Sequence, residues 1–230
     1  MNLKIVFMLW GKWCDNKGLI YLDKILKMLD IYLTLPHEII CFTDINIRRL
    51  PFNDKVKYIK IPDSVLEWRR NFPKIYMHCP DNGLEEGDRI LYLDLDSIII
   101  NNFDNMASYD GDFCGIKTYR SQDAGYISGG LLSFEFGTTS YLWRSLYDNY
   151  KRWELKCRGH ERIFYKFLVP KSDFWNDLYI NEFVDYKKNL KENKNVLNLP
   201  EDAVFIHFHG IPRIHTIKND KFINQYWNSL

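Results

Sequence analysis

A short apolar segment that ends in two acids constrains the fold of this chain more than any other feature. Residues 90–93 are apolar on both faces, which is typical of a strand at the centre of a parallel sheet. Asp94 and Asp96 follow at once, and their side chains share one side if the backbone stays extended. Because open α/β sheets bind ligands at the carboxyl ends of their strands, the segment predicts an α/β fold with two carboxylates at its ligand-binding edge.

The elements expected around this strand complete an α/β pattern. Pro62 should start a helix in which Ser64 and Glu67 form a capping box. No linker or repeat interrupts the chain, so we expect one domain, residues 1–230. Apolar runs and helical periods predict strands at residues 3–8, 37–42, 56–61, 112–116, 126–134 and 203–208, and helices at 18–33, 139–153 and 161–167.

Composition argues against several classes of protein. At 230 residues the chain can bury a substantial core without disulfides or a metal. Its 31 basic and 30 acidic residues nearly cancel, which argues against a nucleic-acid-binding protein. The five cysteines are odd in number and form no Cys-x-x-Cys pair, so we expect reduced thiols in a cytoplasmic protein. No apolar run is long enough for a transmembrane helix, so we expect at most a peripheral membrane contact.

A second segment suggests what the acids bind. Neighbouring carboxylates repel each other unless a cation lies between them, and Mg²⁺ and Mn²⁺ prefer such oxygen ligands. Late in the chain, His207 and His209 follow an apolar run, and Gly210 allows a tight turn before Arg213. An imidazole suits Mn²⁺ better than Mg²⁺, and an arginine can bind a phosphate with two hydrogen bonds. An ordinary acidic turn and a histidine-rich surface loop stay open as alternatives.

Taken in order, four segments resemble motifs of family 8 glycosyltransferases, the glycogenin-like and lipopolysaccharide galactosyltransferase-like enzymes. The segments are residues 92–96, 127–132, 159–161 and 207–213. The second lacks the family's Asn, the third has His160 in place of Asp, and the fourth has Arg213 in place of Lys and no Pro-Trp after it. Residues 10–11, 32–36 and 41–44 also resemble a group of bacterial and viral glycosyltransferase-like proteins.

This resemblance implies a GT-A fold, in which a mostly parallel central sheet is flanked by helices. It implies transfer of a sugar from a nucleotide-diphospho-sugar, a UDP-sugar above all, to a hydroxyl of a glycan, lipid or protein. Asp94, Asp96 and His207 would hold Mn²⁺ or Mg²⁺, with His209 as the alternative to His207. Residues 1–100 would be the nucleotide-binding half and residues 101–230 the sugar and acceptor half. The candidate donor contacts are Trp10, Thr43, Asp44, Lys74, Asp94, Leu95, Ser128, Gly129, Gly210 and Arg213.

Asp96 and Glu161 are the candidate catalytic residues. The resemblance implies that Glu161 binds the sugar near its anomeric carbon, and the alternative is that Glu161 is the base for an acceptor hydroxyl. Asp123 could line the acceptor side.

Two other functions stay open. A nucleotidyltransferase that makes a nucleotide-sugar would share the acid pair, but it usually has a Gly-rich basic stretch after the first strand, where this chain has only Gly11 and Lys12. A non-catalytic sugar- or nucleotide-binding module fits the aromatic content of 16% but leaves the acid pair and the distant histidine unexplained.

Overall fold

The computed structural model describes residues 2–12, 16–46, 50, 53–118, 126–193, 197–208, 210–218 and 220–230. The chain divides into two compact units. Unit 1 consists of Met1–Gly11, Pro36–Leu93 and Asp110–Phe174, and unit 2 of Lys12–Leu35, Asp94–Tyr109 and Trp175–Leu230. The expected single domain, with its halves at 1–100 and 101–230, stays a prediction. Within the described residues, no helix combines the length and the apolar character needed to cross a membrane.

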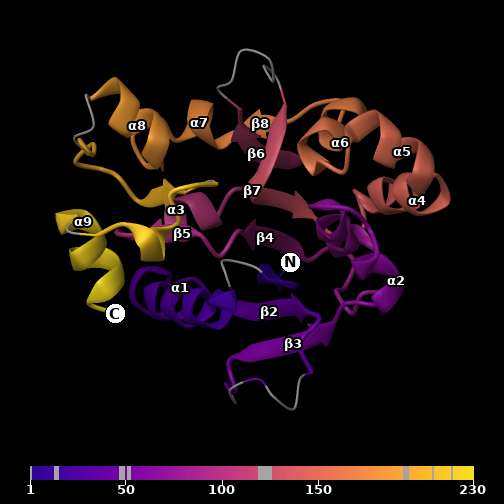
Figure 1. Cartoon of the computed structure of the whole chain (residues 1–230), viewed down its shortest axis with the longest axis horizontal. Helices are drawn as coiled ribbons and strands as arrows, with labels where there is room; N and C mark the ends of the chain where they lie inside the picture. The colour runs from indigo at the N-terminus through magenta and orange to yellow at the C-terminus, as the bar shows by residue number, and fades with distance from the viewer. Residues whose placement is uncertain are drawn as a thin grey trace. The chain divides into compact units, whose positions relative to one another are not determined.

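Unit 1 is built on a seven-stranded sheet with the order β3-β2-β1-β4-β7-β6-β8 (Figure 1). Four of its neighbouring pairs are parallel, and β7 pairs antiparallel with both β4 and β6. The sheet is therefore mostly parallel. Its strands are β1 (Leu3–Leu9), β2 (His37–Thr43), β3 (Val56–Lys60), β4 (Arg89–Leu93), β6 (Phe113–Lys117), β7 (Ile127–Glu135) and β8 (Asp173–Phe174).

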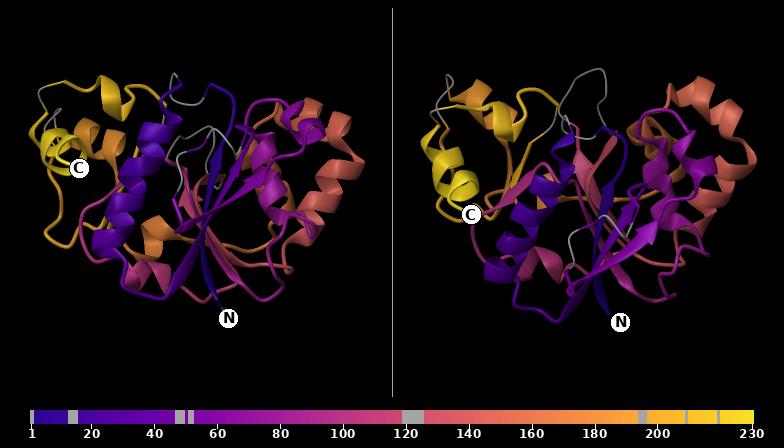
Figure 2. Two further views of the ribbon diagram at one scale, coloured as in Figure 1. Left: turned by 90° about the horizontal axis from the view of Figure 1, so that it is seen from below. Right: turned by 60° about the horizontal axis from the view of Figure 1, so that its bottom comes forward.

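Helices pack on this sheet through alternate strand residues such as Val6, Ile40 and Tyr92, which lie in one buried cluster with residues of the helices. In both views of Figure 2 the coral helices α4 to α6 lie beside the purple segment that holds α2 and η3. The helices of unit 1 are α2 (Asp63–Leu66), the 3-10 helix η3 (Phe72–His78), α4 (Ser140–Asp148), α5 (Tyr150–Cys157) and α6 (Glu161–Leu168).

Unit 2 contains a three-stranded sheet, β5-β10-β9, in which β10 is antiparallel to β5 and parallel to β9. The long helix α1 packs on β5, where Met28 Sδ accepts a hydrogen bond from Ile99 N at 3.3 Å. The elements of unit 2 are α1 (Gly18–Tyr32), β5 (Ser97–Ile99), α3 (Asp104–Ala107), α7 (Trp175–Leu178), β9 (Phe183–Asp185), α8 (Tyr186–Glu192), β10 (Phe205–His207), η5 (Ile214–Thr216), α9 (Lys221–Ile223) and the π-helical turn η6 (Asn224–Asn228).

The expected strands and helices are confirmed apart from their ends and three local differences. The helix predicted at 139–153 is two helices that meet at Asn149. The predicted capping box is wrong, because α2 is only four residues long, has Pro62 as its N-cap and receives no side-chain cap hydrogen bond. The central strand β4 has a parallel neighbour on one side only, since β7 pairs with it antiparallel.

Candidate active site

The acid segment begins where β4 ends, at Leu93, and the chain then bends at Leu95 and Asp96. The alternation expected for an extended segment therefore does not apply to Asp94 and Asp96. Asp94 is half-buried, while Leu95 and Asp96 are buried. Of Leu95, only the backbone can face a ligand.

The pairing of β5 with β10 brings the acid segment next to the predicted histidine motif. Ser97 lies opposite His207 in the antiparallel register, and Phe208 N donates a hydrogen bond to Asp96 O at 3.2 Å. The His207 ring is buried and lies 6.3 Å from the Phe183 ring of β9, centroid to centroid. Two segments far apart in the sequence thus lie side by side in unit 2.

Arg213 completes this group. Its Nη1 donates to Asp96 Oδ2 at 3.0 Å, across 117 residues of sequence. Gly210 has the left-handed φ of +64°, as the predicted tight turn requires, and a Cβ there would lie 3.3 Å from Lys187 Nζ. His209, the alternative metal ligand, lies outside the described residues, as does Asp123.

Two carboxylates and one imidazole suit Mn²⁺ in their chemistry, and the backbone brings their segments together in unit 2. In the arrangement of the side chains, however, Asp96 is paired with Arg213. Among the residues that the structure describes, no three His, Cys, Asp or Glu side chains form a group that could hold a metal. The residue types thus suit a divalent ion, but their side chains do not form a metal site in the arrangement in which Arg213 is paired with Asp96.

A second group of predicted residues meets in unit 1. Lys74, on η3, is buried and donates through Nζ to Gly129 O of β7 at 3.2 Å. Its Nζ also lies 4.0 Å from Glu161 Oε1, at the start of α6, and 5.4 Å from the centre of the Tyr92 ring. Glu161 is 5% exposed, and its Oε2 accepts no hydrogen bond from the part of the chain that is described. A buried carboxylate oxygen without a donor is a candidate ligand contact, because burial without a partner costs free energy.

Local backbone structure positions Glu161. Helix α5 ends at Cys157, its C-cap Arg158 has φ +51°, and Gly159 follows with φ +75°. A Cβ on Gly159 would lie 3.0 Å from Arg69 O, so only glycine fits this close approach. Glu161 then occupies the first turn of α6, where the helix dipole stabilises a carboxylate.

The predicted donor contacts near the ends of β1 and β2 form a third group. Asp44 Oδ2 accepts from Gly11 N at 2.8 Å, which ties the segment after β1 to the segment after β2. Thr43 is fully buried, and its Oγ1 accepts from Ile45 N at 3.1 Å. Trp10 is partly buried against the core of unit 1. Thr43 and Asp44 therefore have structural roles that do not need a ligand. Ser128, half-buried on β7, lies opposite Ile116 and one residue before Gly129.

One acid near the histidine motif was missed by sequence reasoning. Asp185 ends β9 and lies beside His207 in the parallel register. Its Oδ1 also caps α8 by accepting from Lys188 N at 2.8 Å. The sequence carries a signal for this residue, because Asp185 directly follows the short apolar run Phe183-Val184. Asp94 likewise directly follows an apolar run.

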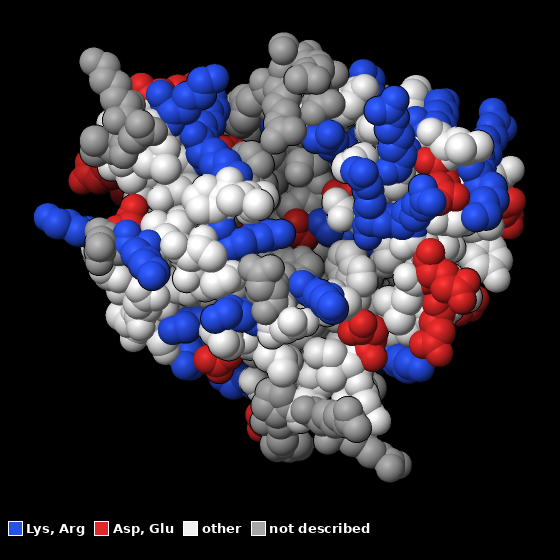
Figure 3. Space-filling view, in the orientation of Figure 1, with Lys and Arg blue, Asp and Glu red and all other residues white. Residues whose placement is uncertain are grey.

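Charge on the molecular surface is mixed, in line with the small net charge of +1. Figure 3 shows basic side chains gathered over the region of α4 to α6, with acids among them. The exposed basic residues of α5, of its C-terminal end and of α6 are Lys151, Arg152, Lys156, Arg158 and Lys166.

No protein-family model matches this chain, and no curated protein matches it. Solved structures do. The galactosyltransferase LgtC, in complex with donor and acceptor sugar analogues, aligns over 99% of this chain and 96% of its own, with a TM-score of 0.67 and 12% identity. An active-site glutamine-to-glutamate mutant of LgtC gives a TM-score of 0.66 at the same coverage and identity. The glycosyltransferase GlyE of Streptococcus pneumoniae gives 0.69 at 13% identity, over 99% of this chain and 60% of GlyE. These similarities confirm the predicted fold class, the GT-A fold.

Proposed function

We propose that this chain transfers a sugar from a UDP-sugar to a hydroxyl of a glycan, lipid or protein acceptor, with the help of a divalent metal ion, preferably Mn²⁺. One observation carries the proposal more than any other. The acid segment, His207 and Arg213, which sequence motifs single out separately, lie together in unit 2 through the β5–β10 pairing and the Asp96–Arg213 ion pair. The fold shared with LgtC and GlyE supports it.

In the proposed reaction the bond between the sugar's anomeric carbon and the diphosphate oxygen breaks. A bond to the acceptor oxygen forms, the acceptor hydroxyl loses its proton, and UDP departs with the electrons of the broken bond. A divalent ion held by Asp94, Asp96 and His207 would stabilise the charge on the departing diphosphate. Arg213 would leave Asp96 when the ion binds and would donate to a phosphate instead.

Glu161 and Lys74 are assigned to the sugar and its acceptor. The Oε2 of Glu161 has no donor among the residues described, so a sugar hydroxyl could donate to it. The same oxygen could instead accept the proton of the acceptor hydroxyl. Lys74, with its Nζ 4.0 Å from Oε1, keeps the carboxylate oriented in either role.

Release of UDP from UDP-glucose, UDP-galactose and UDP-N-acetylglucosamine tests this proposal, with added Mn²⁺ and with EDTA. We expect Mn²⁺-dependent release from at least one donor and a loss of about 100-fold or more in Asp96→Asn, which corresponds to about 2.7 kcal/mol of transition-state stabilisation. Asp81→Asn, which changes an exposed acid of unit 1, is the matched control and should keep the full rate. Equal rates in EDTA, or release of pyrophosphate from UTP and a sugar phosphate, would contradict the proposal.

A further inference from the structure

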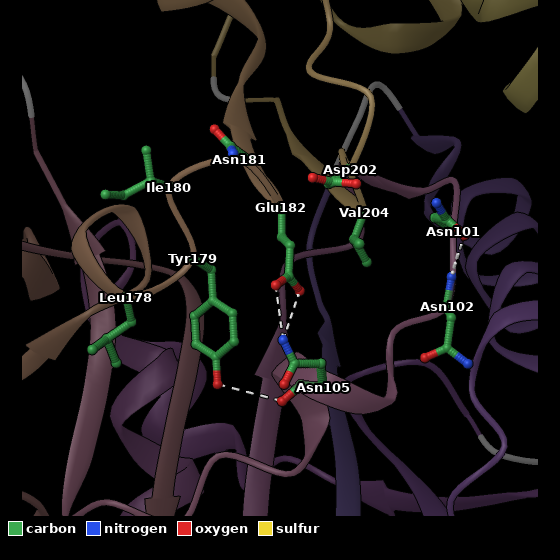
Figure 4. A pocket seen from close by; sticks show the side chains of 10 residues that line it. All are labelled: Asn101, Asn102, Asn105, Leu178, Tyr179, Ile180, Asn181, Glu182, Asp202 and Val204. Carbon is green, nitrogen blue, oxygen red and sulfur yellow. Dashed lines mark hydrogen bonds between the residues drawn. The ribbon is translucent and has the colours of Figure 1, made fainter.

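Unit 2 contains a cavity of about 520 Å³, and none of the described residues that line it is a predicted site residue (Figure 4). Its wall comes from three segments. The first follows β5 and enters α3, the second runs from the end of α7 to the start of β9, and the third precedes β10. The lining residues are Asn101, Asn102, Asn105, Leu178, Tyr179, Ile180, Asn181, Glu182, Asp202 and Val204.

This cavity lies at the opposite end of the β5–β10 pair from the acid segment. Ser97 and His207 face each other at one end of the pair, and Ile99 and Phe205 at the other. The pairing continues past Ile99, because Ile100 N donates to Val204 O at 2.9 Å. At about 3.3 Å per residue, Asn101 is roughly 17 Å along the chain from Asp96. The cavity is therefore separate from the acid segment.

Main-chain hydrogen bonds hold the three wall segments together. Val204 N and Phe205 N both donate to Glu182 O, at 2.8 and 2.9 Å. Phe183 N donates to Tyr179 O at 2.8 Å. The lining residues lie in turns, connecting segments and helix ends next to the strands, and these main-chain bonds fasten them to the sheet of unit 2, which favours binding without a large ordering cost.

Side chains in the cavity are also held in place. Asn105 Nδ2 donates to both carboxylate oxygens of Glu182, at 2.8 and 3.1 Å, and Tyr179 donates through its hydroxyl to Asn105 O at 3.3 Å (Figure 4). Asn101 Oδ1 accepts from Asn102 N at 2.9 Å, which leaves the Asn101 amide NH₂ to donate to a ligand.

The chemistry of the lining selects a class of ligand. Among the described residues that line the cavity there is no lysine or arginine, and Glu182 and Asp202 are acids, so a phosphate or another anion is disfavoured. A divalent cation is disfavoured as well, because both oxygens of Glu182 already accept from Asn105. Amides and carboxylates instead offer paired donors and acceptors of the kind that neighbouring hydroxyls of a sugar can match.

Apolar surface lies next to these polar groups. Leu178 and Ile180, on either side of Tyr179, are 52% and 72% exposed. A sugar ring presents hydroxyls at its edge and C–H groups on its faces, and such a mixed surface matches both parts of this wall. We propose that the cavity binds a neutral oligosaccharide. The proposal does not rest on the transfer reaction and would hold in a chain without catalytic activity.

Titration calorimetry with maltohexaose, cellohexaose and N-acetyl-chitohexaose tests the proposal on the full chain. The test variant is Asn181→Ala/Asp202→Ala, because both side chains are exposed and make no hydrogen bond within the described structure, so the fold should be unaffected. Asn2→Ala/Asp148→Ala, two exposed residues of unit 1, is the matched control.

We expect at least one hexasaccharide to bind the wild-type chain, a 10-fold or greater loss of affinity in the test variant, and no change in the control. Three results would overturn the proposal. The first is that none of the hexasaccharides binds at 10 mM. The second is that the test variant and the wild type bind with equal affinity. The third is that members of a random decapeptide library bind at this cavity while the saccharides do not.

Discussion

At the scale of single residues, the ion pair between Asp96 and Arg213 couples the two charges most important to the proposed site. Asp96 is buried, and the ion pair supplies the positive charge that a buried carboxylate needs. If a divalent ion takes over this role, Arg213 becomes available to the diphosphate. A bound ion would release Arg213 for the diphosphate, and a diphosphate bound to Arg213 would release Asp96 for the ion. The ion and the diphosphate would then favour each other's binding.

The two histidines of the late motif can be distinguished by mutation. His207 ends a packed strand, where its position is well fixed, and the spacing to Gly210 and Arg213 matches the family 8 motif only if His207 is the proposed ligand. We expect His207→Ala to lower Mn²⁺-dependent UDP release by about 10-fold or more relative to His209→Ala. If His209→Ala is the more damaging variant across a Mn²⁺ titration, the register of the motif is wrong by two residues.

A different histidine, His78, has a structural role. It is fully buried on η3, with Thr139 Oγ1 at 2.8 Å from Nδ1 and the Tyr165 hydroxyl at 3.3 Å from Nε2. Burial lowers the pKa of His78 to about 3. The neutral ring therefore links η3 to Thr139, just before α4, and to α6.

This burial predicts a pH dependence of stability. Below about pH 6.5 the unfolded chain binds a proton at His78 that the folded chain does not bind until about pH 3, so stability falls as the pH falls through this window. The free energy of unfolding should lose about 1.4 kcal/mol per pH unit from this residue. Urea titrations at several pH values between 6 and 4 give the free energy of unfolding at each pH. The slope of this free energy against pH should be smaller by that amount in His78→Gln than in the wild type. Equal slopes in the two proteins would mean that His78 takes up its proton in the folded state.

At the scale of elements, the turn between α5 and α6 determines where Glu161 lies. Asn71 N donates to Gly159 O at 3.2 Å, and Arg70 contacts the His160 ring. The turn is thereby fastened to the segment that leads into η3, which carries Lys74. Correct placement of Glu161 relative to Lys74 depends on this short connection.

Substitution of Gly159 tests this dependence. Gly159→Ala combines an unfavourable φ of +75° with a Cβ only 3.0 Å from Arg69 O. Gly87→Ala is the control, since Gly87 has φ +85° but nothing within 4 Å of the added Cβ. We expect the control to lose about 1 kcal/mol of stability and Gly159→Ala to lose about 2–3 kcal/mol, together with UDP-release activity. Equal losses in thermal or urea unfolding would show that the turn tolerates the close contact.

Elements with a clear pattern could be predicted from sequence, and the others could not, for physical reasons. Strands such as β1 and β4 are unbroken apolar runs, and α1 shows a helical period over 15 residues. By contrast, η3 is buried at all seven positions and so has no amphipathic period. Strands β5 and β9 are three residues long, too short for a periodic signal.

The same limits apply to the candidate site. An acid directly after an apolar strand is visible in the sequence, so Asp94 and Asp96 could be singled out. That His207 would lie beside this segment depends on the pairing of two three-residue strands, which no local pattern specifies. The approach of Lys74 to Glu161 depends on η3, which sequence reasoning missed.

At the scale of the whole molecule, the accessibility of buried thiols measures how readily unit 1 opens. Cys41, Cys79, Cys114 and Cys157 are free and buried, and all four belong to this unit. Burial raises the pKa of Cys41 to about 12 and that of Cys157 to about 11, and it also raises the pKa of Cys79 and Cys114. Cys14 lies outside the described residues.

The reaction of these thiols with a disulfide reagent is therefore expected to be slow. In a Cys14→Ser variant at pH 8, the four thiols should react at least 100-fold more slowly in the native protein than in urea, because both access and the thiolate are lacking. Rapid reaction of two or more thiols in the native variant would show that unit 1 opens far more readily than its packing indicates.

The central claim, that the acid segment binds a divalent ion together with the nucleotide diphosphate, is tested most directly by Mn²⁺ titration with and without UDP. The chain offers an incomplete set of ligands and an arginine on Asp96, and the phosphates of UDP supply further oxygens. We predict at least about 10-fold tighter Mn²⁺ binding in saturating UDP than without it, and loss of this difference in Asp96→Asn. Equal Mn²⁺ affinity with and without UDP, or the same UDP-dependent gain in Asp96→Asn, would contradict the account.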